Sequence, residues 1–291
     1  MVHAGHFGPM VDADSFQAID KALELGINFI DTSDAYGAGY SETLLGKALK
    51  GRRDKVVIAT KGGNTMVGPK RGTRDFSIAH IGTVLDESLQ RLQTDYIDLY
   101  QLHNPTVDVI ENGEVWDLLE RRKQEGKIRH YGVSINKMEE GMAAIRLGRS
   151  DSIQIEYNLL AQQPRDEVLP TATTAKVGVI ARVPLRRGLL SGKMTVRDVD
   201  RFQGEDVRVR QYTREVLETE LPKVERLRFL VREPFQTLAQ AAIAFCIADP
   251  SVTSVIPGAR NAAQMEENAK AGDWTLPAAD LEQIEHLWRS A

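Results

Sequence analysis

The chain has 291 residues, of which 42% are hydrophobic and 27% are charged, as in ordinary soluble globular proteins. Its 37 Lys and Arg nearly balance 41 Asp and Glu, so the net charge of -4 offers no basic field for nucleic acid and no polybasic membrane signal. The single cysteine, Cys246, excludes an internal disulfide and a multi-cysteine metal site. With no apolar run that could cross a bilayer and no visible signal peptide, we expect a cytoplasmic protein.

Short apolar runs along the chain predict seven buried strands. They are nearly continuous and rich in Ile and Val, as in parallel strands that are covered on both faces. The runs are INFIDTS from Ile27, KVVIATK from Lys55, YIDLYQLH from Tyr96, RHYGVSI from Arg129, SIQIEYNLL from Ser152, VGVIARVPL from Val177 and TSVIPGA from Thr253.

Amphipathic segments between these runs predict helices. The first begins near Asp14, which forms a capping-box-like pair with Gln17, and it stops at Gly26. Ser77 is the predicted N-cap of a later helix. Regular alternation of strands and helices, with no linker, predicts a single α/β domain over residues 1–291. Right-handed connections leave two architectures, an open doubly wound sheet and a closed barrel.

Two parts of the chain depart from this alternation. Only thirteen residues precede the helix at Asp14, and HAGHFGPM there gives no convincing strand. A barrel would then lack its first strand, through an unusual closure or because the chain starts late. Residues 194–234 are highly charged and separate the last two strands by more than a crossover needs. We expect a solvated helix with a loop there, or a lid over a ligand.

Polar side chains stand at the ends of several predicted strands. Asp31 and Tyr36 follow the first strand, Lys61 ends the second, and His103 with Asn104 ends the third. In a parallel barrel the C-terminal ends of all strands point to one face, where active sites form. Four titratable groups of four types on three consecutive strands are hard to explain as solvated loop residues.

The chemistry of these four side chains fits proton transfer to a carbonyl oxygen. A tyrosine with its usual pKa of ~10 is a poor acid at neutral pH, but an adjacent ammonium lowers that pKa by favouring the phenolate. Tyr36 is therefore the predicted general acid and Lys61 the group that tunes it. Asp31 would anchor Lys61, and His103 would orient the carbonyl. A Schiff base at Lys61 would leave Tyr36 and His103 unexplained, and no metal site is predicted.

The motifs in this order resemble the aldo-keto reductase family over nearly the whole chain. GINFIDTSDAYGAGYSETLLGKAL resembles the family signature around the catalytic aspartate and tyrosine, VVIATKGG its lysine strand and YIDLYQLHNP its histidine strand. Segments from YGVSIN to SVIPGARNAAQMEEN resemble its successive cofactor-binding segments. The resemblance implies a (β/α)8 TIM barrel that binds NADPH and reduces an aldehyde or ketone, with Asp31, Tyr36, Lys61 and His103 as the tetrad. Relative to the family, the N-terminal hairpin and first strand are missing or truncated.

The resemblance also implies the cofactor contacts. Ser134 and Gln154 match positions that hydrogen-bond the nicotinamide carboxamide, although Ile135 stands where many members have asparagine. Arg182 stands where many members have an aromatic residue stacked on the nicotinamide, and a planar guanidinium can stack as well. The remaining positions are Leu185, Gly188 and Lys193 for the pyrophosphate, Gly258 and Arg260 for the 2′-phosphate, and Gln264, Glu267 and Asn268 toward the adenine.

Two alternatives to an NADPH-dependent carbonyl reductase stay open at this point. One is a barrel that binds NADPH without useful turnover, as a redox sensor or interaction subunit. The other is an inactive product of a shortened gene. Turnover of simple aldehydes separates the first alternative from a reductase, and a sharp thermal unfolding transition argues against the second.

Arg260 is the best local anion site in the chain, and it favours NADPH over NADH.

Overall fold

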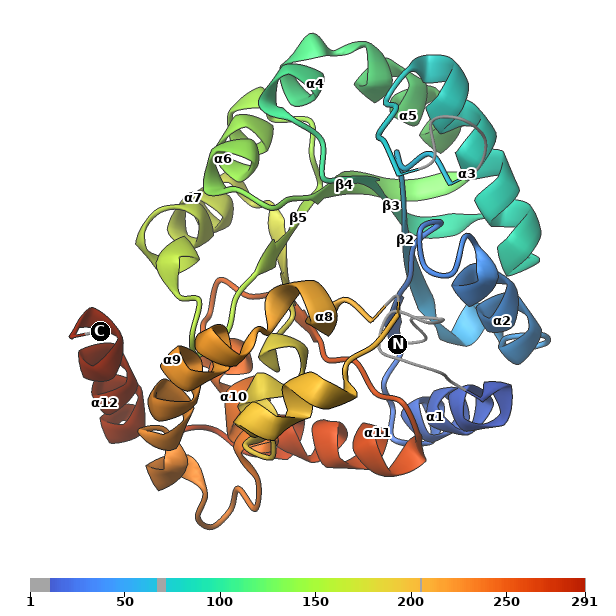
Figure 1. Cartoon of the computed structure of the whole chain (residues 1–291). Coiled ribbons are helices and arrows are strands. Elements are labelled where there is room, and N and C mark those ends of the chain that lie inside the picture. The colour runs from blue at the N-terminus through green and yellow to red at the C-terminus, as the bar shows by residue number, and fades with distance from the viewer. Residues whose placement is uncertain (1–10, 67–71, 205, 291) are drawn as a thin grey trace.

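The computed structural model describes residues 11–66, 72–204 and 206–290 (Figure 1). Its seven strands are all parallel and form one curved sheet in chain order, each strand hydrogen-bonded to the next. The strands are β1 (Phe29–Asp31), β2 (Val57–Gly62), β3 (Ile97–His103), β4 (Ile128–Ser134), β5 (Ser152–Glu156), β6 (Gly178–Arg182) and β7 (Ser254–Ile256). The predicted TIM-barrel fold class is confirmed.

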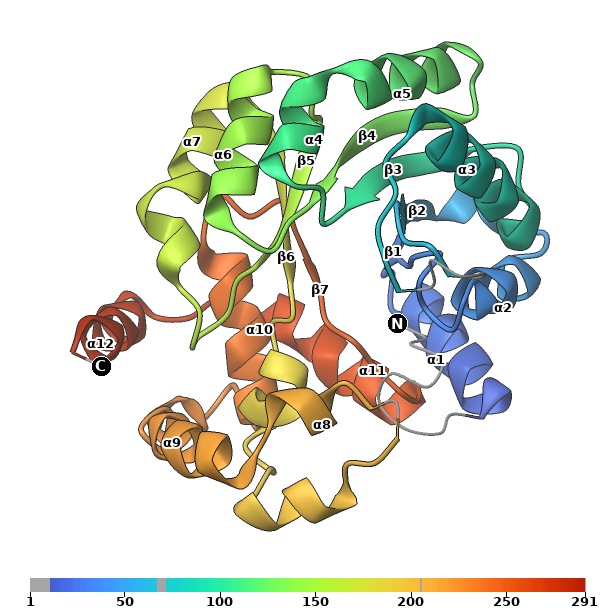
Figure 2. The same cartoon turned by 45° about the horizontal axis from the view of Figure 1, so that its top comes forward.

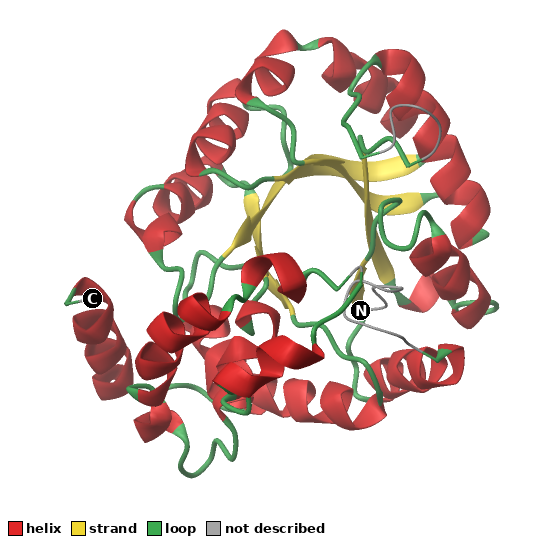
Figure 3. Cartoon of the chain, viewed as in Figure 1, coloured by secondary structure: helices red, strands yellow, loops and turns green. Residues whose placement is uncertain are grey.

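Helices surround the sheet, as the view coloured by secondary structure shows (Figure 3). None of the described helices is long and apolar enough to cross a membrane. The main helices are α1 (Asp12–Glu24), α2 (Tyr40–Ala48), α3 (Ile78–Leu92), α4 (Val107–Asn112), α5 (Glu114–Gln124), α6 (Met138–Leu147), α7 (Val168–Ala175), α10 (Leu238–Ala248), α11 (Ala262–Ala269) and α12 (Ala278–Arg289).

The helix ends follow local chemistry, with one difference from the prediction. The Ser77 hydroxyl accepts the N–H of His80 and caps α3, as predicted. Helix α1 starts two residues before the predicted Asp14, because the Val11 carbonyl already accepts the N–H groups of Asp14 and Ser15. Asp14 thus lies in the first turn, where a carboxylate complements the helix dipole.

Strands β1 and β7 are the two edges of the described sheet. The barrel is nearly closed, and the opening lies between these two strands. Helix α1 packs against α11 outside these edges, and both views show the two helices side by side (Figure 2). All three residues of β7 remain half-buried, since an edge strand has a neighbour on one side only. The expected absence of a first strand concerns residues 1–10, which lie outside the described residues.

The described part of the charged segment 194–234 contains two α-helices, α8 (Arg208–Gln211) and α9 (Arg214–Glu225), and two 3-10 helices, Val196–Arg201 and Arg228–Leu230. It lies on the α10–α11 side of the barrel, away from α4 and α5 (Figure 2). Tyr212, Leu217 and Leu230 are buried, so the segment packs on the protein and is more than a solvated helix with a loop. The Tyr212 hydroxyl donates to the Arg186 carbonyl and thereby ties the segment to the chain that follows β6.

Candidate active site

Strands β1 and β2 deliver a buried ion pair at their C-terminal ends. The fully buried Lys61 donates from Nζ to Asp31 Oδ1 at 2.6 Å and to the Thr32 carbonyl oxygen at 2.8 Å. Burial lowers the pKa of Lys61, but the Asp31 carboxylate and Tyr36 outweigh it, so the pKa is raised overall. The ammonium is therefore held charged and in a fixed position.

The ion pair continues into a buried hydrogen-bonded chain across the barrel. Gln154 donates from Nε2 to Asp31 Oδ2 at 2.7 Å, and the Ser134 hydroxyl donates to Gln154 Oε1 at 3.2 Å. The sequence predicted Ser134 and Gln154 as nicotinamide ligands and did not predict their contact with Asp31. Through this chain the two predicted groups of residues become one network, in which Gln154 orients the carboxylate that anchors Lys61.

Tyr36 lies between the ion pair and His103. Its ring centroid is 5.2 Å from Lys61 Nζ, and its ring meets the His103 imidazole edge-on at 6.2 Å between centroids. Burial raises the pKa of Tyr36, while the Lys61 charge and hydrogen bond lower it. The ammonium acts in the predicted direction, but the net pKa is above its ordinary value because burial disfavours the phenolate more strongly.

Two residues that the sequence analysis did not assign contact the His103 ring. Nδ1 of His103 lies 3.0 Å from the Ser33 hydroxyl and 2.9 Å from Asn64 Nδ2. The Ser33 hydroxyl also donates to Asp34 Oδ1 at 3.0 Å. Their sequence signals were position alone: Ser33 and Asp34 lie inside the DTSDAY stretch, and Asn64 lies three residues after Lys61.

Arg182 ends β6 on the same face of the barrel. It donates from Nη2 to the Ile135 carbonyl and to Asn136 Oδ1, each at 2.9 Å, and its Nη1 lies 3.9 Å from Glu156. Burial lowers the pKa of Arg182. Its Nε is buried and has no hydrogen-bond partner within the described structure. The guanidinium thus lies at the barrel mouth with its hydrogen bonds to described residues made through Nη2.

The residues predicted for the pyrophosphate and adenosine form a second group near α11. Leu185 is half-buried and directly precedes the 3-10 segment Arg186–Ser191, in which Gly188 has a φ of 97°. Pairwise contacts join these segments: Lys193 with Glu267 at 3.9 Å, Asn268 Nδ2 with the Gly258 carbonyl at 3.2 Å, and the Arg260 N–H with Gln264 Oε1 at 2.9 Å.

This second group has the charges that a phosphate-bearing cofactor requires. Residues 182–197 contain five cationic side chains and no acidic one, in a chain whose net charge is -4. The first turn of α11 is also free of acidic residues. Helix N-termini and basic side chains are favourable surroundings for phosphate. The residues present therefore fit a phosphate-bearing cofactor.

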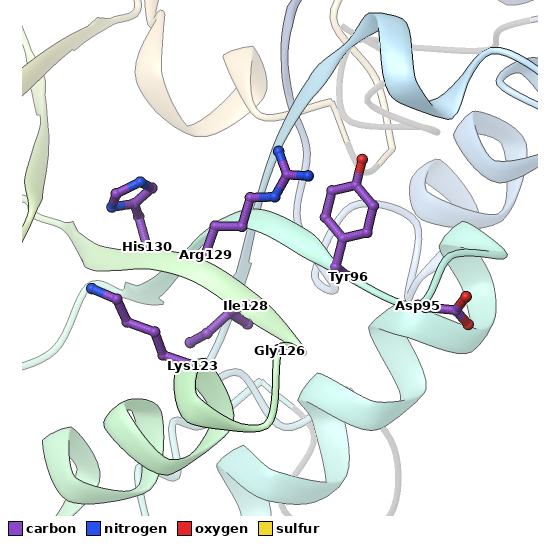
Figure 4. A pocket seen from close by; sticks show the side chains of 7 residues that line it. All are labelled: Asp95, Tyr96, Lys123, Gly126, Ile128, Arg129 and His130. Atoms are coloured by element: carbon purple, nitrogen blue, oxygen red, sulfur yellow. The ribbon is translucent and has the colours of Figure 1, made fainter.

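A separate hollow of about 580 Å³ lies at the other end of β3 and β4 (Figure 4). Its cations are already paired, Arg129 with Asp98 at 2.9 Å and Lys123 with Asp151 at 3.7 Å, and Nδ1 of His130 lies 3.2 Å from the same Asp151 carboxylate. It holds none of the strand-end residues described above, so it is not the candidate active site. Among the described residues, no group of three or more His, Cys, Asp or Glu could hold a metal ion.

Comparison with known proteins identifies the family to which the chain is similar. The sequence profile of the Aldo/keto reductase family matches residues 2–289. Aldo-keto reductase YhdN of Bacillus subtilis is 34% identical over 287 residues, which cover 96% of this chain and 84% of that protein. The holo form of aldo-keto reductase AKR11C1 from Bacillus halodurans superposes with a TM-score of 0.79 at 34% identity, covering 96% of this chain and 88% of the other. An aldo/keto reductase from Klebsiella pneumoniae, solved in complex with NADP and acetate, superposes at 0.70 with 25% identity, covering 99% and 87%.

The parallel barrel and the polar face at its strand ends define an oxidoreductase that acts on carbonyl groups. The chain belongs to the aldo/keto reductase family.

Proposed function

We propose that the protein reduces a small aldehyde or ketone to the alcohol, with Tyr36 as the proton donor and NADPH as the hydride donor. The observation that carries this proposal is the buried Lys61–Asp31 pair, 2.6 Å long, beside the Tyr36 ring. A charged ammonium held next to a buried phenol has little structural value, since burying a charge is costly. It has a direct use when the phenol must lose a proton.

NADP(H) is the cofactor of this family, and when bound it would supply a hydride to the carbonyl carbon. Tyr36 donates its proton to the carbonyl oxygen as negative charge develops there. The Lys61 ammonium stabilises the resulting phenolate, and Asp31 holds the ammonium in place. His103 donates a hydrogen bond to the same oxygen and orients it. The product is the neutral alcohol.

The cofactor would extend from the barrel mouth to α11. Ser134, Gln154 and Arg182 would hold the nicotinamide end, since they lie on the strand ends next to the ion pair. The remaining cofactor residues proposed are Leu185, Gly188, Lys193, Gly258, Arg260, Gln264, Glu267 and Asn268.

We also propose that the chain acts as a single domain, with segment 194–234 beside the cofactor face. The bond from the Tyr212 hydroxyl to the Arg186 carbonyl supports this placement. We place the reaction in the cytoplasm, where a buried free thiol such as Cys246 stays reduced.

The proposal is tested with Tyr36→Phe, which removes the hydroxyl group and keeps the ring. We expect kcat for aldehyde reduction to fall by about 10²–10⁴-fold, with the Kd for NADPH within about twofold of wild type because the ring remains. Tyr96→Phe is the matched control, since Tyr96 lines the hollow at the opposite end of the barrel. Unchanged turnover in Tyr36→Phe would remove Tyr36 as the acid. A wild-type protein that binds NADPH but turns over no aldehyde would favour the sensor alternative.

A further inference from the structure

Two neighbours of His103 Nδ1 among the described residues differ in what they can offer to a ring nitrogen. Asn64 presents its amide Nδ2, which only donates, at 2.9 Å. Ser33 presents a hydroxyl at 3.0 Å that can donate or accept. Ser33 lies 3.0 Å from both Nδ1 and Asp34 Oδ1, so its hydroxyl can donate to either group or accept from Nδ1, and it is compatible with both tautomers of the ring. Asn64, whose Nδ2 only donates, is the neighbour that discriminates between the tautomers.

The chain after β2 is built to bring Asn64 to this position. Gly62 passes the Tyr100 hydroxyl so closely that a Cβ there would lie 2.0 Å from it. Gly63 has a φ of 119°, and a Cβ there would lie 2.3 Å from the Phe76 ring. Two consecutive glycines thus let the backbone turn where larger residues would collide.

Backbone contacts then hold Asn64 in place. It forms an antiparallel bridge with Arg74, and its carbonyl oxygen lies 3.2 Å from His80 Nε2. The backbone of Asn64 is therefore held on both sides, by the backbone of Arg74 and by the His80 side chain. This is the arrangement expected of a residue that orients a functional group.

An amide N–H facing Nδ1 determines where the imidazole carries its proton. Nδ1 must accept the hydrogen bond, so a neutral ring carries its single proton on Nε2. A second proton on Nδ1 would meet the Asn64 N–H and would add a positive charge beside Tyr36, which Lys61 already flanks. The Nε2–H tautomer is the form of His103 that can donate to a carbonyl oxygen next to Tyr36.

We propose that Asn64 is a positioning residue for carbonyl reduction, which donates from Nδ2 to Nδ1 of His103 and so keeps the imidazole neutral with its proton on Nε2. This inference rests on the function proposed above for His103. The tautomer itself is a property of the protein without cofactor or substrate, so it is measured independently of turnover.

Asn64→Asp tests the inference because the carboxylate has nearly the same shape but only accepts. Nδ1 must then carry a proton, and the ring becomes the Nδ1–H tautomer or an imidazolium. Two-bond ¹H–¹⁵N spectra of ¹⁵N-histidine-labelled protein report the protonation of each ring nitrogen, with His103→Gln identifying the His103 signals. We expect Nε2–H in the wild type and a protonated Nδ1 in Asn64→Asp.

Kinetics of the same variants give the second readout. We expect kcat for aldehyde reduction to fall by about 10²–10³-fold in Asn64→Asp, as for the loss of one donor to a reacting oxygen. The Kd for NADPH of Asn64→Asp should stay within about twofold of the wild-type value. The kcat of Asn64→Ala should lie between those of Asn64→Asp and the wild type. Asn28→Asp is the matched control, because Asn28 is exposed and precedes β1 at the opposite end of the barrel.

Each contrary result has a separate meaning. A proton on Nδ1 in the wild type would overturn the inference, as would an unchanged tautomer in Asn64→Asp. A changed tautomer with unchanged kcat would show that Asn64 has no positioning role in catalysis. A wild-type protein without turnover would instead contradict the proposed function, while the tautomer spectra would still decide where His103 carries its proton.

Discussion

Asp34 is a buried carboxyl whose ionisation should destabilise the fold. Its side chain is nearly inaccessible, and within the described structure its Oδ2 has no hydrogen-bond partner. Burial and then the Glu42 charge raise the pKa of Asp34 from 3.8 to about 7. Hydrogen bonds from Ser33 and Ala35 and the charge of Arg91 lower it, but by less. The buried phenol of Tyr100 also lies within the field of Asp34.

The sign of the effect follows from the direction of this shift. Because the pKa of Asp34 is higher in the folded than in the unfolded chain, the contribution of this group to stability is greatest below about pH 4 and is lost as the pH rises through about 7. Each unit of difference in pKa corresponds to about 1.4 kcal/mol, so the ionised carboxylate costs about 4 kcal/mol above that range. Roughly 2–3 kcal/mol of this loss falls between pH 5 and pH 8.

Asp34→Asn keeps the shape of the side chain and removes the ionisation. We expect its free energy of unfolding to exceed that of the wild type by a margin that grows by about 2–3 kcal/mol from pH 5 to pH 8. Urea unfolding at pH 5, 6.5 and 8 measures this margin. Asp54→Asn is the control, because Asp54 is exposed and its substitution should change stability by less than about 0.5 kcal/mol. A margin for Asp34→Asn that is the same at every pH would refute the reasoning.

Two further variants address the cofactor contact and the turn after β2. Arg260→Ala should weaken NADPH binding by about 10–100-fold, because one charged hydrogen bond is lost, and should leave the Kd for NADH within about twofold of wild type. Fluorescence titrations measure both affinities. Equal losses for NADPH and NADH would contradict the 2′-phosphate assignment. Gly63→Ala should lower the free energy of unfolding by about 2–3 kcal/mol, since it combines a φ of 119° with an overlap on Phe76. Gly26→Ala, at a φ of 79° with open space around it, should lose only about 1 kcal/mol, and equal losses would exclude the overlap as the cause.

Much of the fold was predictable because burial leaves a local record in the sequence. A strand covered on both faces must be apolar along its whole length, so all seven strands of the described sheet coincide with predicted runs. The start of α1 was wrong by two residues, since a backbone carbonyl from Val11 replaced the predicted side-chain cap. The packing of segment 194–234 was hidden by its surface charges, although Tyr212 and Leu217 are buried within it.

The candidate site, like the fold, was predictable from the sequence only in part. Placing Asp31, Tyr36, Lys61 and His103 at strand ends required only the order of the strands and the rule that parallel strands end on one face. The bond from Gln154 to Asp31 joins residues 123 positions apart, and it exists because β5 lies across the barrel from β1. The net rise in the pKa of Tyr36 depends on how deeply the phenol is buried, which no local pattern records.

The sequence by itself determined the class of fold, the family and the face on which polar groups gather, because hydrophobic runs and strand-end residues are local properties. Only the tertiary structure decided which of those groups touch. The contact of Asn64 with His103 Nδ1 follows from the turn at Gly62 and Gly63 and from the pairing of β2 with β3. The contact of Ser33 with the same nitrogen also needs the pairing of β1 with β2. Distances of 3 Å between side chains from separate strands are set by the closure of the barrel, and the chemistry of the site depends on them.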